Sequence, residues 1–266
     1  MNPSILVRNL REENLEDVFQ VCSHARLQDP LQRRGMELKR RWLLEMLSRY
    51  GPCTKVAYLE GRPIAQLLYY PEEALPYVEE PRRDVIRLHC IYNPFPEARG
   101  RGAASALLRE LLREAEGGME MLGGKPCRFI AAKPFNTGEG IPLEEFYASK
   151  GFRWGVGEMY LEVAGAYEPR EAGEYRPLSE DEGRAIVFYS PLCEYSYPFA
   201  VRVAELIREV EPSLPIELID MWRQPLEARR GFGEELIVNA RPIRAWWGDR
   251  EAFKEAVRRV LKIESN

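Results

Sequence analysis

A short glycine-rich stretch, Arg99-Gly-Arg-Gly-Ala-Ala104, has residue types suited to binding an anion. Gly100 and Gly102 lack a Cβ, so the backbone can turn tightly and approach a ligand closely there. Small and apolar residues then recur at helical spacing up to Ala115, which predicts a helix directly after the glycines. The free N–H groups and the dipole at a helix start attract negative charge. The stretch therefore predicts a phosphate or pyrophosphate cradle, with a plain strand-to-helix turn as the alternative.

Two common phosphate-binding motifs do not fit this stretch. A P-loop requires Lys followed by Ser or Thr after its glycines, and a dinucleotide fingerprint requires a third glycine at a fixed place. The sequence has neither feature here. The kind of anion therefore has to be inferred from the rest of the chain.

Two motifs resemble those of the Gcn5-related N-acetyltransferases, the GNAT family. Arg99, Gly102 and Ala104 match that family's Arg/Gln-x-x-Gly-x-Gly/Ala loop, which holds the pyrophosphate of acetyl-CoA. Tyr147 and the Gly151-Phe152 pair match a Tyr-x-x-x-Gly-Phe signature near the end of the family's domain. The resemblance covers residues 1–165 and implies an α/β (α+β) fold with a mixed central sheet. It also implies direct transfer of an acetyl group from acetyl-CoA to a primary amine.

The resemblance assigns cofactor-binding roles to residues around the glycine loop. In the family, backbone N–H groups of the strand before the loop hold the acetyl carbonyl and the pantetheine arm. The connection Asn93–Ala98 is longer than usual, so the register of that strand is open. The expected cofactor-binding residues are Ile91, Tyr92, Arg99, Gly100, Arg101, Gly102, Ala103, Ala104 and Asn136.

Two side chains are candidates for moving protons. Tyr147 matches the family tyrosine that protonates the departing CoA thiolate as a general acid, with packing on its aromatic neighbours as the alternative. His89 lies on the strand where the family often carries a base or positions a water, and imidazole titrates in a useful range. A structural histidine is the alternative for His89. The sequence does not identify the acceptor amine, which could be a small molecule or a peptide.

Periodicity and turn residues place these candidates on a series of strands and helices. Strands are expected at 5–8, 54–59, 63–70, 84–92 and 126–132, with two more within 153–163. Helices are expected at 11–24, 31–50, 104–115 and 142–150, and a loop at 71–81. This order agrees with the acetyltransferase fold that the motifs imply.

A second domain is expected at 185–266, after a linker at 166–184 that is rich in Glu, Pro, Arg and Gly. Its predicted order, β-α-β-α-β-β-α, resembles the thioredoxin or glutaredoxin fold. The predicted elements are strands at 185–190, 215–221, 235–239 and 241–247 and helices at 198–210, 224–230 and 249–263. An acetyltransferase followed by such a domain resembles the bacterial YoaP-type proteins.

Cys193, Ser196 and Pro242 are the redox candidates of this second domain. Cys193 lies where the fold carries its redox cysteine, and Pro242 lies at the place of its cis-proline. Because Ser196 stands at the second position of the pair, only monothiol chemistry is expected. A thiol before a helix can have a lowered pKa, and a purely structural role is the alternative. A non-catalytic acyl-CoA-binding or thiol-sensing protein that uses Cys193 is thus a second hypothesis for function.

The composition is typical of a soluble globular protein. Hydrophobic residues make up 45% of the 266, charged residues 30%, and the formal net charge is −4, so we expect no nucleic-acid partner. There is no signal-like start or membrane-spanning apolar stretch, which favours a cytoplasmic protein. The five cysteines are scattered without a Cys-x-x-Cys pair, so neither a metal site nor a disulfide framework is expected. The sequence does not indicate an oligomeric state.

Overall fold

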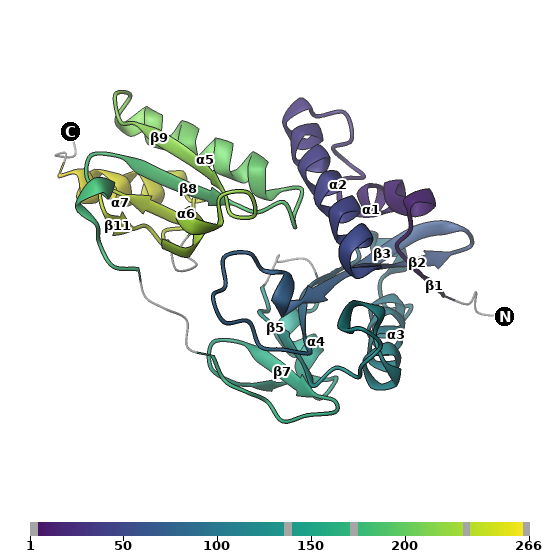
Figure 1. The fold of residues 1–266 in the computed structure, drawn as a ribbon. Coiled ribbons are helices and arrows are strands. Elements are labelled where there is room, and N and C mark those ends of the chain that lie inside the picture. Colours follow the sequence, from purple (N-terminus) through teal and green to yellow (C-terminus); the bar gives the residue numbers. More distant parts are fainter. Residues whose placement is uncertain (1–4, 136–139, 171–174, 231–234, 263–266) are drawn as a thin grey trace. The chain divides into compact units, whose positions relative to one another are not determined.

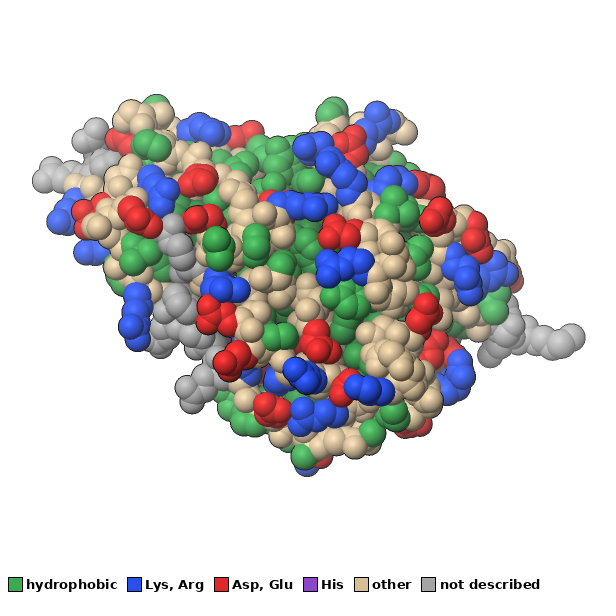
Figure 2. Space-filling view, viewed as in Figure 1, with side chains coloured by type: hydrophobic (Ala, Val, Ile, Leu, Met, Phe, Trp, Pro, Cys, Tyr) green, Lys and Arg blue, Asp and Glu red, His purple; other side chains and the backbone are tan. Residues whose placement is uncertain are grey.

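The computed structural model describes residues 5–135, 140–170, 175–230 and 235–262. Contacts divide the chain into two compact units. Unit 1 comprises residues 1–28, 40–75 and 79–171, and unit 2 comprises residues 29–39, 76–78 and 172–266. Within the described residues, no helix is long and apolar enough to cross a membrane. On the face shown in Figure 2, side chains of both charge signs are interspersed.

Unit 1 contains a seven-stranded sheet of order β1-β2-β3-β4-β5-β7-β6 (Figure 1). Its strands are β1 Leu6–Asn9, β2 Thr54–Leu59, β3 Arg62–Pro71, β4 Val85–Tyr92, β5 Phe129–Ala132, β6 Arg153–Trp154 and β7 Met159–Glu162. The β4–β5 pair is parallel and the other neighbours are antiparallel. The mixed sheet predicted from the sequence is therefore confirmed, as is the β2–β3 hairpin, whose Glu60 and Gly61 both have positive φ.

The helices of unit 1 follow the expected order. They are α1 Leu15–Cys22, α2 Pro30–Tyr50, α3 Ala103–Gly117 and α4 Leu143–Ala148. The prediction of a helix from residue 11 was wrong at its start, because Glu12–Asn14 form a single 3₁₀ turn before α1. Tyr69 and Tyr70 of β3 face opposite sides of the sheet: Tyr69 lies near Lys55, which pairs with α3, and Tyr70 meets Trp42 of α2. Helices thus pack on both faces of the sheet.

Unit 2 contains a four-stranded sheet of order β11-β10-β8-β9. Its elements are β8 Ala185–Tyr189, α5 Ser196–Val210, β9 Ile216–Asp220, α6 Pro225–Arg230, β10 Leu236–Val238, β11 Arg241–Pro242 and α7 Arg250–Leu261. The β8–β9 pair is parallel and the other two pairs are antiparallel. The described elements have the predicted order. The last strand, however, ends at Pro242 rather than residue 247, because Trp246 is exposed and has no strand partner among the described residues.

Residues 29–39, the first part of α2, belong to unit 2 although the sequence places them in the first domain. Lys39 Nζ lies 2.7 Å from a carboxylate oxygen of Glu194, and both side chains are buried. Gly35 packs so closely that a Cβ there would lie 1.9 Å from the Glu194 carbonyl oxygen. These tight contacts explain why residues 29–39 group with unit 2.

Candidate functional site

A cavity of about 550 Å³ lies between the end of β4, the glycine loop and α4. Seven of the nine predicted cofactor-binding residues line it: Ile91, Tyr92, Arg99, Gly100, Gly102, Ala103 and Ala104. Arg101 does not line it, because its side chain turns away and donates to the Glu97 carbonyl oxygen at 3.0 Å. Asn136 lies outside the described residues. The remaining walls come mainly from α4 and the residues before it, including Phe146 and Lys150.

The glycine loop gives this cavity one polar wall. Gly100 and Gly102 have φ values of 73° and 83°, a left-handed conformation that favours glycine. The space beside both α-carbons is open, since a Cβ at either would meet no atom within 4 Å. Gly102 caps α3, and its carbonyl accepts the Ala106 N–H at 2.8 Å. The first N–H groups of α3, which lack partners inside the helix, and its positive dipole end therefore lie at the cavity.

The end of β4 gives a second polar wall. β4 pairs with β5 only from Val85 to Leu88, and from there to Tyr92 its only strand partner among the described residues is β3. A bulge interrupts its pairing with β3, since Tyr69 is opposite Leu88 and Leu68 is opposite Cys90. The edge of β4 that faces β5 is thus open beyond Leu88.

The bulge decides which N–H groups face this open edge. Tyr69 donates its N–H to Cys53, away from β4, so by alternation the backbone of Leu68 faces β4 and that of Cys90 faces β3. The next residue, Ile91, therefore directs its N–H and C=O toward the open side. Before the bulge the even-numbered residues face β5, as Asp84 does when its carbonyl accepts from Arg128. The extra residue reverses the alternation, which the sequence pattern does not reveal.

Tyr147 lies on α4 with its ring 5.2 Å from that of Phe152. The side chain is 1% exposed, and its hydroxyl has no hydrogen-bond partner within the described part of the chain. Burial, with a smaller contribution from Cys90, raises the pKa of Tyr147 well above its usual range. The group therefore stays protonated at neutral pH as a donor. Tyr147 is not among the residues that line the cavity, but its neighbour Phe146 is.

His89 sits at the bulge in β4. Its ring is half-buried and lies 6.3 Å from the ring of Tyr70, on the sheet face that α2 covers. It does not line the cavity. The structure thus places His89 on the strand that supplies the cavity's open edge, but does not bring it to the cavity wall.

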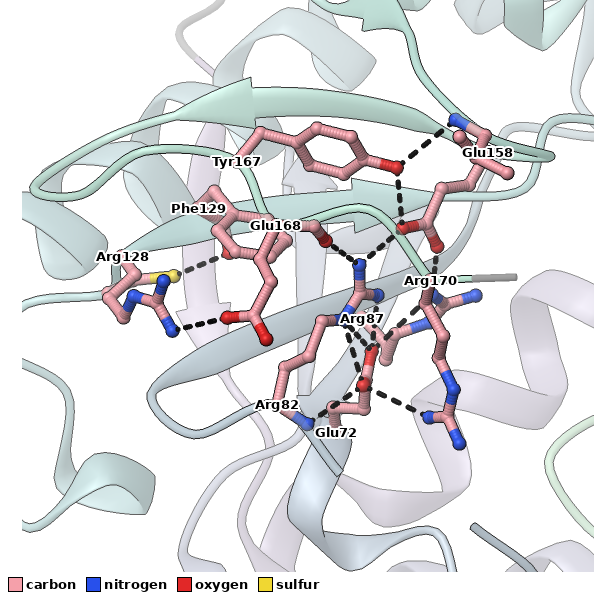
Figure 3. A network of polar contacts seen from close by, with 11 residues as sticks. Glu72, Arg82, Arg87, Arg128, Phe129, Glu158, Tyr167, Glu168 and Arg170 are labelled. Atoms are coloured by element: carbon pink, nitrogen blue, oxygen red, sulfur yellow. Dashed lines mark hydrogen bonds and ion pairs between the residues drawn. The ribbon is translucent and has the colours of Figure 1, made fainter. Parts of the chain in front are cut away.

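A network of buried charges lies on the sheet face that α2 covers. Figure 3 shows its members. Arg82 hydrogen-bonds both carboxylate oxygens of Glu72 and lies 2.7 Å from Glu158. Arg87 of β4 pairs with Glu158 and lies 3.6 Å from Glu72. Burial alone would raise the pKa of Glu72, but the hydrogen bonds from Arg82 lower it below the usual value. These paired charges lie beside the buried apolar cluster of Val85, Phe129 and Ala131, and the Arg82 guanidinium is 5.1 Å from the centre of the Phe129 ring.

This network connects segments that are far apart in the sequence. Glu72 follows β3, Arg87 lies within β4, and Glu158 precedes β7. The Tyr167 hydroxyl donates to Glu158 at 3.3 Å and accepts the Val156 N–H at 3.2 Å. The network therefore braces β4 close to the residues that form the cavity. The sequence reasoning missed it, because it treated 71–81 as a loop and the members share no local spacing.

In unit 2, the structure contradicts two expectations about the redox candidates. Burial, assisted by Glu194, raises the pKa of Cys193, and Lys39 and nearby N–H groups oppose this only in part. The expected lowering of that pKa was wrong. The bond before Pro242 is trans, so the expected cis-proline was also wrong. The Ser196 hydroxyl accepts the Ser190 N–H at 2.9 Å.

None of the five cysteines forms a disulfide in the structure. In the part of the chain that the structure describes, no three His, Cys, Asp or Glu side chains form a group that could hold a metal ion.

No protein-family model and no curated protein sequence matches the chain. Solved structures do show similarity. A GNAT family acetyltransferase from Brucella melitensis in complex with acetyl-CoA is 15% identical, with a TM-score of 0.41 over 64% of this chain and 94% of that one. A putative GNAT acetyltransferase from Desulfovibrio desulfuricans is 18% identical, with a TM-score of 0.42 over 60% and 100%. The ribosomal-protein-alanine N-acetyltransferase of Brucella melitensis is 21% identical, with a TM-score of 0.41 over 59% and 99%. Similarity at this level leaves the function to be inferred from the chain's own site.

Proposed function

We propose that the chain is an acetyl-CoA-dependent N-acetyltransferase that transfers acetyl directly to a primary amine. The observation that carries this proposal is one cavity where a helix start, an open strand edge and the helix that bears Tyr147 meet. A CoA thioester needs a site for its pyrophosphate, a groove for its extended arm and donors at its thioester. The three walls can supply these in that order.

Cofactor binding would begin at α3. The pyrophosphate accepts hydrogen bonds from the N–H groups that follow Gly102, where the helix dipole favours negative charge. Lys150, which lines the cavity, adds a positive charge. The pantetheine arm contains amide groups, and the free edge of β4 beyond Leu88 offers backbone partners for them. These residues thus position the thioester near Ile91.

The transfer step would use groups of β4 and α4. The amine nitrogen attacks the thioester carbonyl, the C–N bond forms, and the C–S bond breaks. The N–H of Ile91 stabilises the negative charge that develops on the carbonyl oxygen. Tyr147 gives its proton to the CoA sulfur as general acid, and the amine loses its proton to His89 or to a water that His89 positions. The acceptor is a small-molecule or peptide amine.

For unit 2 we propose a thioredoxin-like domain of the YoaP type over residues 185–266. The sheet order β11-β10-β8-β9 and the alternation of strands and helices support it. The raised pKa of Cys193 favours a structural role for this domain over thiol chemistry.

A panel of primary amines tests the main proposal. Acetyl-CoA is incubated with each amine, and release of free CoA is followed alongside acetyl-CoA binding by calorimetry. We expect binding without amine and CoA release with at least one amine class. Binding with no release across small amines and peptide N-termini would favour the alternative, a non-catalytic acyl-CoA-binding protein. Absence of binding would refute both.

A further inference from the structure

A second cavity, of about 230 Å³, lies at the other end of α3 from the glycine loop. The 15 residues of α3 separate the two cavities by roughly 22 Å, at 1.5 Å rise per residue. The second cavity is lined by residues of β1 and β3, by the last turn of α3 and by the segment that follows. It is therefore distinct from the proposed acetyl-CoA site.

The charges around this cavity do not balance. Lys55 is buried, donates to Asn9 Oδ1 at 2.5 Å and forms an ion pair with Glu114 at 2.7 Å, so its charge is matched. Glu120, which lines the cavity, has no ion pair with any described residue. The C-terminal end of α3 adds partial negative charge. The cavity thus carries an excess of about one negative charge.

Tyr69 supplies a second, independent feature. Its side chain is 1% exposed and lines the cavity, and no described residue hydrogen-bonds to its hydroxyl. Tyr69, Glu114 and Glu120 all line the cavity. Burial raises the pKa of Tyr69, and Glu114, Cys53 and Glu120 raise it further. The hydroxyl oxygen is therefore an acceptor in the cavity that no described residue uses. A ligand that carries an N–H donor would satisfy it.

We propose that this cavity binds a small primary ammonium ion. The –NH₃⁺ group lies between the Tyr69 hydroxyl and the carboxylates of Glu114 and Glu120, and its three N–H donors match these three acceptors. The alkyl chain lies against the apolar side chains of Met119 and Met121. The volume corresponds to about eight waters at ~30 Å³ each, which suits a short aliphatic amine.

The test measures binding to the whole protein without acetyl-CoA, so its outcome is independent of the proposed function. n-Butylammonium chloride is titrated while the amide NMR signals of Gly118 and Met119 are followed, against sodium chloride at equal ionic strength. We expect a saturable shift that sodium does not produce. Tyr69→Phe and Glu120→Gln should each weaken binding at least fivefold. Glu116→Gln, an exposed position on α3 outside the cavity, is the matched control and should bind as the wild type does.

Several outcomes would overturn the proposal. These are shifts that do not saturate, equal shifts with sodium, equal affinity for n-butylguanidinium, and unchanged binding by Tyr69→Phe. Misfolding does not confound that variant, because the hydroxyl has no hydrogen-bond partner among the described residues to lose. Its melting temperature without amine should equal or exceed that of the wild type. Amine should then raise the melting temperature of the wild type but not that of Tyr69→Phe.

Discussion

Two helices of equal length begin next to residues of predicted function, but their surroundings differ. α3 and α5 each have 15 residues. In front of α3, Gly100 and Gly102 leave open space, and the helix start faces a cavity of about 550 Å³. In front of α5, the chain's own groups occupy the place, since the Tyr195 and Ser196 N–H groups hydrogen-bond the Cys193 thiol and the buried Glu194 pairs with Lys39.

A helix start can bind an anion only where no group of the protein already hydrogen-bonds its first N–H groups. Both helices have the same dipole and the same unpaired N–H groups in principle. At α5, burial outweighs the nearby N–H groups, and the pKa of Cys193 rises. At α3, the N–H groups remain available to an anion. Substitutions in the two regions test this difference.

The first prediction concerns the buried charge network of Glu72, Arg82, Arg87 and Glu158. Glu72→Gln removes one of the two carboxylates that pair with the buried Arg82 and leaves Arg82 and Arg87 to share Glu158. Such an excess buried charge costs about 3–5 kcal/mol of unfolding free energy. Glu110→Gln, whose ion pair is exposed, should cost less than about 1 kcal/mol. Chemical denaturation at pH 7 measures both. A loss for Glu72→Gln as small as for Glu110→Gln would show that the network does not stabilise the fold around β4.

The same residue predicts a pH dependence. Because the pKa of Glu72 is lowered in the folded state, its contribution is complete above its usual value of 4.5 and is lost as pH falls through the folded value. The stability difference between wild type and Glu72→Gln should therefore be constant from pH 7 to about pH 5 and shrink below pH 4.5. Denaturation midpoints across this range measure it. A difference that persists unchanged at pH 3 would contradict the assignment.

The second substitution removes the proposed general acid. Tyr147→Phe should lower kcat about a hundredfold while leaving the affinity for acetyl-CoA unchanged. Since the hydroxyl has no partner among the described residues, stability should not fall. Tyr160→Phe, a half-buried phenol in the same unit, is the control and should keep full turnover. If kcat is unchanged, Tyr147 serves packing alone.

The third substitution fills the space before α3. Gly102→Val forces a β-branched residue into a left-handed conformation and obstructs the anion's approach, so acetyl-CoA affinity should fall about thirtyfold, roughly 2 kcal/mol. Gly61→Val imposes the same backbone strain in the β2–β3 hairpin, far along the sheet, and should bind as the wild type does. Calorimetry compares the two. Equal affinity of both folded variants would remove the basis for an α3 site.

The smallest effect is expected at α5. Cys193 should be alkylated no faster at neutral pH than the half-buried Cys22, with a half-maximal rate above pH 9.0. Glu194→Gln should shift that midpoint down and Lys39→Gln should shift it up, because the two charges act in opposite directions. Mass spectrometry of timed alkylation measures the rates. Rapid, selective labelling of Cys193 would show that it is a reactive thiol and that the start of α5 is as available as that of α3.

Much of the fold could be predicted because its signals are local. The periodicity of α3 and the turn at Glu60 and Gly61 depend on neighbours a few residues apart, and the structure has them where the sequence indicates. The predicted ends of helices and strands were less accurate. The helix expected from residue 11 begins at Leu15, and the strand expected to residue 247 ends at Pro242, because burial rather than propensity decides where an element stops.

Two features could be read from the sequence: the glycines before α3, which can adopt a left-handed backbone conformation, and the order of strands and helices. Other features depended on how the chain packs. Packing set the bulge that turns Ile91 outward, the buried and unpartnered hydroxyl of Tyr147, the place of Tyr69 in the second cavity, and the raised pKa of Cys193. Each of these depends on which distant side chains exclude water or supply charge. Burial and partner choice are properties of the packed chain, and no local pattern of residues encodes them.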